Sequence, residues 1–296
     1  MRRNFLFALC FLLGVSLAAV ARDNINLSSP LGTKIELICS SFEPGQIVLA
    51  RLKDASGAKK VSIQFLDQRY ELEPSPEGGS PFALIGVDLG LKPGSYVFGI
   101  TVLRKDGQVE DLERAVSFAA REFPVKKLWV KASYVAPPPE VQSRIQWETE
   151  LLASIYSINT APWLGDGKFS LPNTGETAPN FGERRIYNNL PRSTHAGVDV
   201  KAAYGSPVQA ANSGKVVLAK DLYFSGRTVI IDHGLGVFTF YCHFSAIKVK
   251  RGDSVKKDAL IGLVGSTGRS TGPHLHWGVK IHESRVDPLA LLGLPL

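Results

Sequence analysis

Short runs of apolar residues, separated by turn residues, fill positions 24–122. The runs lie at 34–39, 46–52, 60–66, 82–89, 95–104 and 114–120. Pairs such as Pro44-Gly45, Pro93-Gly94 and Asp106-Gly107 separate them, and these pairs are typical of tight turns. Several short strands at this spacing favour an antiparallel β-sandwich of about immunoglobulin size. This half contains no histidine, so we expect it to be a spacer or a binding module.

The middle of the chain predicts a connector followed by a helix. Three consecutive prolines, 137–139, stiffen the connector that begins near Phe123. Between 140 and 158, the apolar residues Val141, Ile145, Leu152 and Ile155 recur at helical spacing, although Glu148 interrupts the stripe. We therefore predict a helix over 140–158 that packs between the two halves of the chain.

Strand-like runs return after Trp163 and continue almost to the C-terminus. They lie at 198–202, 207–211, 215–223, 227–232, 237–244, 260–265 and 274–281. The turns between them are short and rich in glycine, which is typical of antiparallel neighbours. We expect an antiparallel sheet with a groove on one face.

The first 21 residues have the features of a secretory signal peptide. Arg2 and Arg3 precede an uncharged run over 4–20, and Ala19-Val20-Ala21 forms a small-residue cleavage site. The run falls short of the roughly 20 apolar residues of a spanning helix, so an uncleaved anchor is the lesser alternative. Cys10 follows Leu9 rather than a small residue, which argues against lipid attachment. We predict export to the periplasm or cell envelope, or secretion, without stable membrane insertion after cleavage.

Composition excludes several classes of protein. With 44% hydrophobic and 21% charged residues, the 296-residue chain can bury a core and is no disordered tail. Three cysteines without a CxxC spacing exclude a disulfide-stapled mini-domain. Lys and Arg outnumber Asp and Glu by 16 to 10 between 161 and 296, which suits an anionic substrate. No recognised binding motif accompanies this charge, so we expect no nucleic-acid partner.

All six histidines lie between residues 195 and 282. His195 opens a His-Ala-Gly-Val-Asp run that ends at Asp199. His274 and His276 are two residues apart, and such side chains share one face of a strand. Strict alternation along 237–244 turns His243 into the groove and makes Cys242 a buried core thiol.

These residue types fit a catalytic zinc site. Such a site takes three protein ligands with N, S or O donors and leaves a fourth position open, which two histidines and one aspartate satisfy. The chain has no HExxH helix, so the other groove histidines are the candidates for proton transfer. The alternative for any one of them is a hydrogen-bonded core histidine. We assign that role to His233, beside a glycine turn, and to His282, about 20 Å beyond His276 along the strand.

The motifs of the segment 181–288 also carry a family resemblance. They are FGERR (181–185), HAGVD (195–199), GSPVQAANSGKVV (205–217), VIIDHGLG (229–236), FYCHFS (240–245), GDSV (252–255) and LIGLVGSTGRSTGPHLHWGV (260–279). This segment resembles the catalytic domain of the lysostaphin/LytM-type zinc metallopeptidases, which cut peptide bonds in bacterial peptidoglycan. The resemblance implies Zn²⁺ held by His195, Asp199 and His276, with His243 and His274 as catalytic residues. The N-terminal half is similar to immunoglobulin-like domains that precede some of these peptidases.

We therefore predict a mainly β fold in four parts. They are a signal peptide (1–21), an immunoglobulin-like β-sandwich (22–123), a proline-rich linker and helix (124–162), and a lysostaphin/LytM-type peptidase domain with an antiparallel sheet and an open groove (163–296). The resemblance implies a zinc metalloendopeptidase whose partners are the peptide cross-links of peptidoglycan. In that mechanism a zinc-activated water attacks the scissile amide, assisted by the two catalytic histidines.

Two other functions compete with this prediction. A catalytically silent LytM-like envelope protein would activate other cell-wall hydrolases, but relatives of that kind lose metal ligands, whereas all five site positions are filled here. A biotinyl- or lipoyl-type carrier is suggested by GDSV followed by LIG. Such a carrier needs a lysine at a hairpin tip, where the equivalent turns offer glycine, serine and arginine.

Overall fold

The computed structural model describes residues 23–74 and 78–296. Strands dominate these residues, which confirms the predicted mainly β fold class. The predicted signal peptide, with Cys10, lies outside the described residues. Among the described helices, none has the length and apolar character needed to cross a membrane.

Two four-stranded antiparallel sheets form the N-terminal half. Their strand orders are β1(Asp23–Ser28)-β2(Lys34–Cys39)-β3(Ile47–Asp54)-β6(Phe82–Gly86) and β5(Gln68–Glu71)-β4(Ala58–Phe65)-β7(Gly94–Arg104)-β8(Val109–Phe118). Leu49 of the first sheet and Ile63 and Phe98 of the second are almost fully buried in one apolar cluster. The sheets thus form a sandwich, and its assignment as immunoglobulin-like stays a prediction.

The predicted linker contributes a strand of its own. β9(Val125–Leu128) pairs in parallel with β11(Arg184–Tyr187), which pairs antiparallel with β12(Leu190–Thr194). We call this three-stranded sheet the arm. Most side chains of β9 are exposed, so no apolar pattern marks it as a strand in the sequence.

An eight-stranded antiparallel sheet organises the C-terminal half, as predicted. Its order is β10(Glu176–Ala178)-β13(Gly197–Lys201)-β21(Leu275–Ile281)-β17(Val237–Phe244)-β16(Gly226–Asp232)-β15(Gly214–Leu222)-β19(Ser254–Val255), with β22(Ser284–Val286) also paired to β21. A smaller sheet has the order β14(Pro207–Gln209)-β20(Leu260–Leu263)-β18(Ala246–Ile247). Leu275, Trp277 and Val279 of β21 are fully buried on one face of the large sheet, as expected from alternation.

Helix α1(Pro139–Tyr156) packs on the other face of the large sheet. Ile155 contacts a cluster that contains Leu222 of β15, Ile230 of β16 and Phe238 of β17. The expectation that this helix lies between the two halves is therefore wrong. Its apolar stripe is matched by the apolar side chains of one sheet face, so it needs no second partner.

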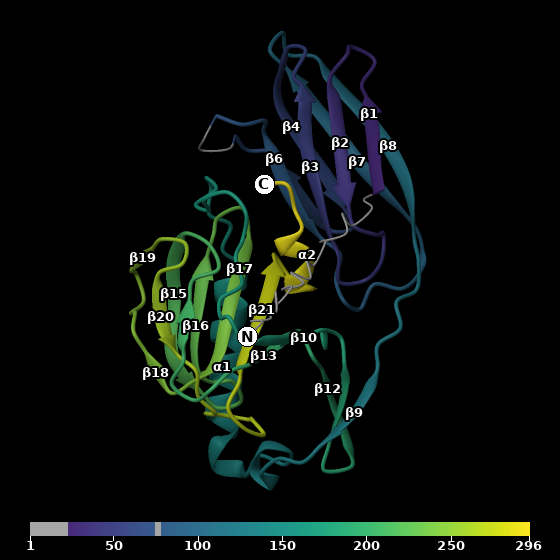
Figure 1. The fold of residues 1–296 in the computed structure, drawn as a ribbon. Coiled ribbons are helices and arrows are strands. Elements are labelled where there is room, and N and C mark those ends of the chain that lie inside the picture. Colours follow the sequence, from purple (N-terminus) through teal and green to yellow (C-terminus); the bar gives the residue numbers. More distant parts are fainter. Residues whose placement is uncertain (1–22, 75–77) are drawn as a thin grey trace, which may run out of the picture.

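The two halves meet instead through the C-terminal segment, which Figure 1 shows in yellow running from the large sheet toward the sandwich. This segment contains β22 and the short helix α2(Pro288–Leu292). Arg285 makes a two-pronged ion pair with Asp88, at 2.7 and 3.0 Å. Arg121 pairs with Asp287 at 2.8 Å. One continuous apolar cluster includes residues of both halves, so they share a core in the folded chain.

Glu148 explains the interruption in the helical stripe. Its carboxylate is buried, with one oxygen accepting from Arg144 Nε at 2.6 Å and the other from the backbone N–H of Tyr223 at 2.8 Å. The Tyr223 N–H follows the end of β15. Glu148 therefore ties α1 to the edge of the large sheet.

We expect Glu148→Ala to lower the free energy of unfolding by about 1–3 kcal/mol, because it leaves the partly buried backbone N–H of Tyr223 without this partner. Glu150→Ala is the matched control, since this glutamate lies on the same helix but is exposed, and it should change stability by less than about 0.5 kcal/mol. Urea denaturation of both variants measures the difference. Equal losses would mean that Glu148 acts only through general helix stability.

Candidate metal centre

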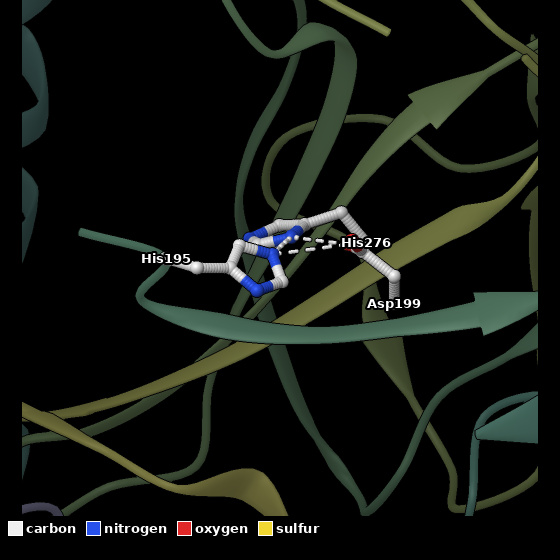
Figure 2. A group of neighbouring side chains, drawn as sticks. All are labelled: His195, Asp199 and His276. Carbon is white, nitrogen blue, oxygen red and sulfur yellow. Dashed lines mark hydrogen bonds and ion pairs between the residues drawn. The ribbon is translucent and has the colours of Figure 1, made fainter. Parts of the chain in front are cut away.

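Three potential ligand atoms converge where β13 pairs with β21. Asp199 and His276 are direct cross-strand partners, so their side chains leave the same face of the sheet. His195 lies two residues before β13. His195 Nε2 lies 2.8 Å from His276 Nδ1, and Asp199 Oδ1 lies 3.0 and 3.1 Å from these two nitrogens (Figure 2). Of the described residues, this trio is the group identified as able to hold a metal ion.

Gly197 permits this close approach. It is the cross-strand partner of Gly278, and a Cβ at Gly197 would meet the carbonyl oxygen of Trp277. The same Cβ would lie 2.8 Å from Cε1 of the His276 ring. The glycine in the His-Ala-Gly-Val-Asp run is thus required by packing against a ligand candidate.

Asn180 and Arg185 fix the orientation of Asp199. The Asn180 side-chain amide donates to Asp199 Oδ2 at 3.0 Å, and its oxygen accepts from the backbone N–H of Asp199 at 3.0 Å. Arg185 Nη2 of the arm donates to the same Oδ2 at 2.6 Å. Oδ2 is therefore occupied by protein donors, which leaves Oδ1 toward the two histidines.

Backbone carbonyls orient the surrounding imidazoles. His195 Nδ1 donates to the carbonyl of Asn180 at 2.9 Å, which turns its Nε2 toward the centre. His243 Nδ1 donates to the carbonyl of Thr267 at 2.8 Å, and His274 Nδ1 to that of Gly272 at 2.9 Å. His274 Nε2 lies 3.6 Å from Asp199 Oδ1, and the rings of His243 and His274 lie 4.8 Å apart.

The expected orientation of Cys242 is wrong. Its thiol is buried as predicted, but Cys242 is the direct cross-strand partner of His276, so both side chains lie on the same face. His243 reaches that face as well because its φ of +67° breaks the alternation of the strand. A positive φ at a residue other than glycine is strained and not visible in an apolar pattern.

Burial controls the protonation of the centre. It lowers the pKa of His276 to about 4 and that of His243 to about 3, so both imidazoles are neutral at neutral pH. Burial acts to raise the pKa of Asp199, but hydrogen bonds from His195 and His276 outweigh it and hold the pKa below its usual range. Burial also raises the pKa of the Cys242 thiol to about 12. At neutral pH, the neutral imidazoles of His243 and His276 thus lie near an ionised Asp199 carboxylate.

The donor set fits a zinc ion. Two imidazole nitrogens and one carboxylate oxygen are a ligand set of catalytic zinc sites. His233 and His282 lie elsewhere. The buried His233 bonds to the carbonyl of Ser213 at 2.7 Å and to Thr239 Oγ1 at 2.8 Å, and His282 packs against Tyr70. The assignment of His195, Asp199 and His276 as ligands, and of His243 and His274 as catalytic residues, stays a prediction.

Two cavities open beside the centre. One, of about 260 Å³, is lined by His195, His243 and His276 and extends toward α1. The other, of about 90 Å³, is lined by Asp199, His243 and His274 and extends toward β9 of the arm. Space for a ligand therefore lies on both sides of the trio.

The profile of peptidase family M23 matches residues 193–288, which contain the three convergent residues together with His243 and His274. Residues 193–288 are therefore a peptidase family M23 domain. This confirms the resemblance to the lysostaphin/LytM type.

Curated proteins that match the M23 domain are named as endopeptidases. The chain is 37% identical over 123 residues to the peptidoglycan DD-endopeptidase ShyA of Vibrio cholerae, covering 41% of this chain and 29% of that protein. It is 41% identical over 97 residues to the DD-carboxypeptidase/endopeptidase Mpg of Neisseria meningitidis, covering 33% of this chain and 22% of that protein. The chain thus matches less than a third of the length of these curated relatives.

One solved structure resembles nearly the whole chain. It is a Pseudomonas aeruginosa protein described as a candidate M23 peptidase, with 27% identity and a TM-score of 0.66. The match covers 86% of this chain and 96% of that one. The N-terminal sandwich and the M23 domain therefore occur together in a second protein.

Sequence reasoning missed the groups that support the M23 domain from outside its matched segment. Asn180 was not predicted as a site residue from the sequence. Arg185 appeared only within the FGERR motif, and no role was assigned to it. Both act through hydrogen bonds to Asp199, and their side chains belong to no apolar repeat that would signal such a contact. The FGERR motif was the one sequence feature that could have pointed to Arg185.

We expect Asn180→Ala to weaken zinc binding by about 10–100-fold, because ligand carboxylates depend on the groups that orient them. The substitution keeps the Asn180 carbonyl that holds His195. Asn212→Ala is the control, since this buried asparagine bonds to residues 166, 167 and 213 instead. Competition with a zinc-binding dye measures both affinities, and equal weakening in the two variants would contradict the role of Asn180.

Proposed function

We propose that this chain is an exported zinc-dependent endopeptidase that hydrolyses the peptide cross-links of peptidoglycan. The observation that carries the proposal is the convergence of two imidazole nitrogens and one carboxylate oxygen within 3.1 Å of one another in an M23 domain. The names of ShyA and Mpg support the class of substrate. Export rests on the signal-peptide features of residues 1–21.

His195, Asp199 and His276 would hold the metal ion. When bound, zinc supplies Lewis acidity, which polarises an amide carbonyl and acidifies water. The chain itself supplies the fixed geometry of the ligands, since Asn180 and Arg185 hold Asp199 and the Asn180 carbonyl holds His195. The metal ligands therefore need little rearrangement to bind the ion.

His243 and His274 supply the proton transfers. Each has its Nδ1–H bound to a backbone carbonyl, so its Nε2 can accept a proton from water and return it to the leaving amine nitrogen. In the protonated form, the same Nε2–H can donate to the oxyanion that develops on the carbonyl. Two histidines are thus available for the steps that a single glutamate performs in HExxH enzymes.

We expect His276→Ala to lose both zinc and activity, because three protein ligands form the catalytic site. His243→Ala should retain about one zinc but lose roughly 10²–10⁴-fold in turnover, since it removes only proton transfer. Zinc content is measured by elemental mass spectrometry, and turnover by the peptides released from purified peptidoglycan.

His282→Asn serves as the control because His282 lies outside the centre and asparagine tolerates its φ of +50°. This variant should keep both zinc and turnover. Equal zinc loss in His243→Ala and His276→Ala would contradict the assigned roles. Full peptide release by the unaltered protein in excess chelator would contradict the metal mechanism, and zinc binding without any release would favour the catalytically silent alternative.

A further inference from the structure

We propose that the larger cavity beside the centre binds one uncharged apolar side chain of the substrate, next to the bond that is cleaved, and that helix α1 forms its outer wall. We call this cavity the helix pocket. The inference rests on the proposed function, because it takes the occupant to be a peptide held at the metal.

The helix pocket is continuous with the metal centre. His195, His243 and His276 form its inner end. Its remaining floor and walls include Leu152 and Tyr156 of α1, Leu222 of β15, Ile230 of β16, and Phe240 and Cys242 of β17. When a substrate amide lies at the metal, a side chain next to that amide would therefore meet a mainly apolar surface.

The charged groups at the pocket lie toward the arm and are already engaged. Arg185 bonds to Asp199 at 2.6 Å and to Glu183 at 3.3 Å. The guanidinium of Arg269 lies 4.5 Å from the ring centre of Tyr187 and 5.0 Å from that of Phe224. The end formed by α1 offers leucine and aromatic side chains instead. An apolar occupant matches this end, because a buried polar group without a partner costs free energy.

The size of the pocket limits the occupant. A volume of about 260 Å³ lies just below the roughly 300–1,000 Å³ of typical small-molecule sites. It suits a single side chain rather than an extended stretch of peptide. Beyond it, α1 covers the sheet, where Ile155 packs against Leu218, Leu222 and Phe238.

The helical wall is held in place by polar contacts as well as by packing. Glu148 ties α1 to the backbone of Tyr223, and Arg144 of the same helix donates to the carbonyl of Asp221 at 3.1 Å. Helix α1 lies outside the segment matched by the M23 profile. The specificity of this pocket is thus contributed by a part of the chain that the family profile does not include.

The test measures binding of three hydroxamates to the zinc-loaded full chain by calorimetry. Acetohydroxamate reports whether the metal is open to a ligand. N-acetyl-leucine hydroxamate and N-acetyl-asparagine hydroxamate carry side chains of nearly equal shape but opposite polarity. We expect the leucine compound to bind roughly 10–100-fold more tightly, as burial of one leucine side chain provides.

Leu152→Asn and Leu151→Asn form a matched pair of variants. Both leucines pack against the same cluster under α1, but only Leu152 lines the pocket. Leu152→Asn should reduce the preference for leucine over asparagine to less than about threefold. Leu151→Asn should leave the preference within about twofold of the unaltered protein, and acetohydroxamate should bind equally to all three.

Equal affinity of the unaltered protein for the leucine and asparagine compounds would overturn the apolar pocket while acetohydroxamate binding still supports the proposed function. Equal loss of preference in the two variants would overturn the role of Leu152 as a wall. If acetohydroxamate does not bind the zinc-loaded chain, the open metal site is wrong, and the proposed function and the pocket fail together. The comparison on the unaltered protein decides the proposal even if a variant does not fold.

Discussion

The register of β13 against β21 is the constraint on which the site depends. It places Asp199 directly opposite His276 and Gly197 opposite Gly278. A shift by one residue would turn every side chain of β13 to the other face of the sheet, removing Asp199 from the centre and placing Val198 there. The register is held by the opposite face, where Val198, Val200, Leu275 and Trp277 are fully buried. The apolar core thus fixes the geometry of a polar site.

A buried polar cluster also needs partners for its remaining donors and acceptors. For Asp199 and His195 these partners come from segments before the matched M23 domain, namely Asn180 in a loop and Arg185 in the arm. Helix α1, which also precedes that domain, borders the larger cavity. The C-terminal segment then joins the large sheet to the sandwich through Arg285 and Asp88. Surroundings outside the matched segment therefore complete the centre and shape the space beside it.

Much of this arrangement could be predicted because it follows from local periodicity. Alternation identified the strands that carry Asp199 and His276, and the two-residue spacing of His274 and His276 indicated their common face. The helix over 140–158 was expected and occurs as Pro139–Tyr156. Family resemblance, rather than spacing, selected His195, Asp199 and His276 from the possible ligand sets, and their roles remain predictions.

What could not be predicted depends on contacts between distant segments. The arm strand β9 is mostly exposed, so its pairing with β11 leaves no apolar pattern. The packing of α1 on one sheet depends on side chains about 65 to 85 residues away in the sequence. The predicted sheet face of the Cys242 side chain was wrong because alternation assumes regular strand dihedrals, whereas His243 has a positive φ.

The X-ray absorption spectrum of the zinc-loaded full chain at the zinc edge tests the central claim most directly. Convergence of His195, Asp199 and His276 on one ion predicts nitrogen and oxygen neighbours at about 2.0–2.2 Å, with outer-shell scattering from two imidazole rings. The buried thiol of Cys242 lies on the same sheet face as His276, so the spectrum can distinguish two ligand sets. A sulfur neighbour at about 2.3 Å, or scattering from no imidazole, would contradict the account.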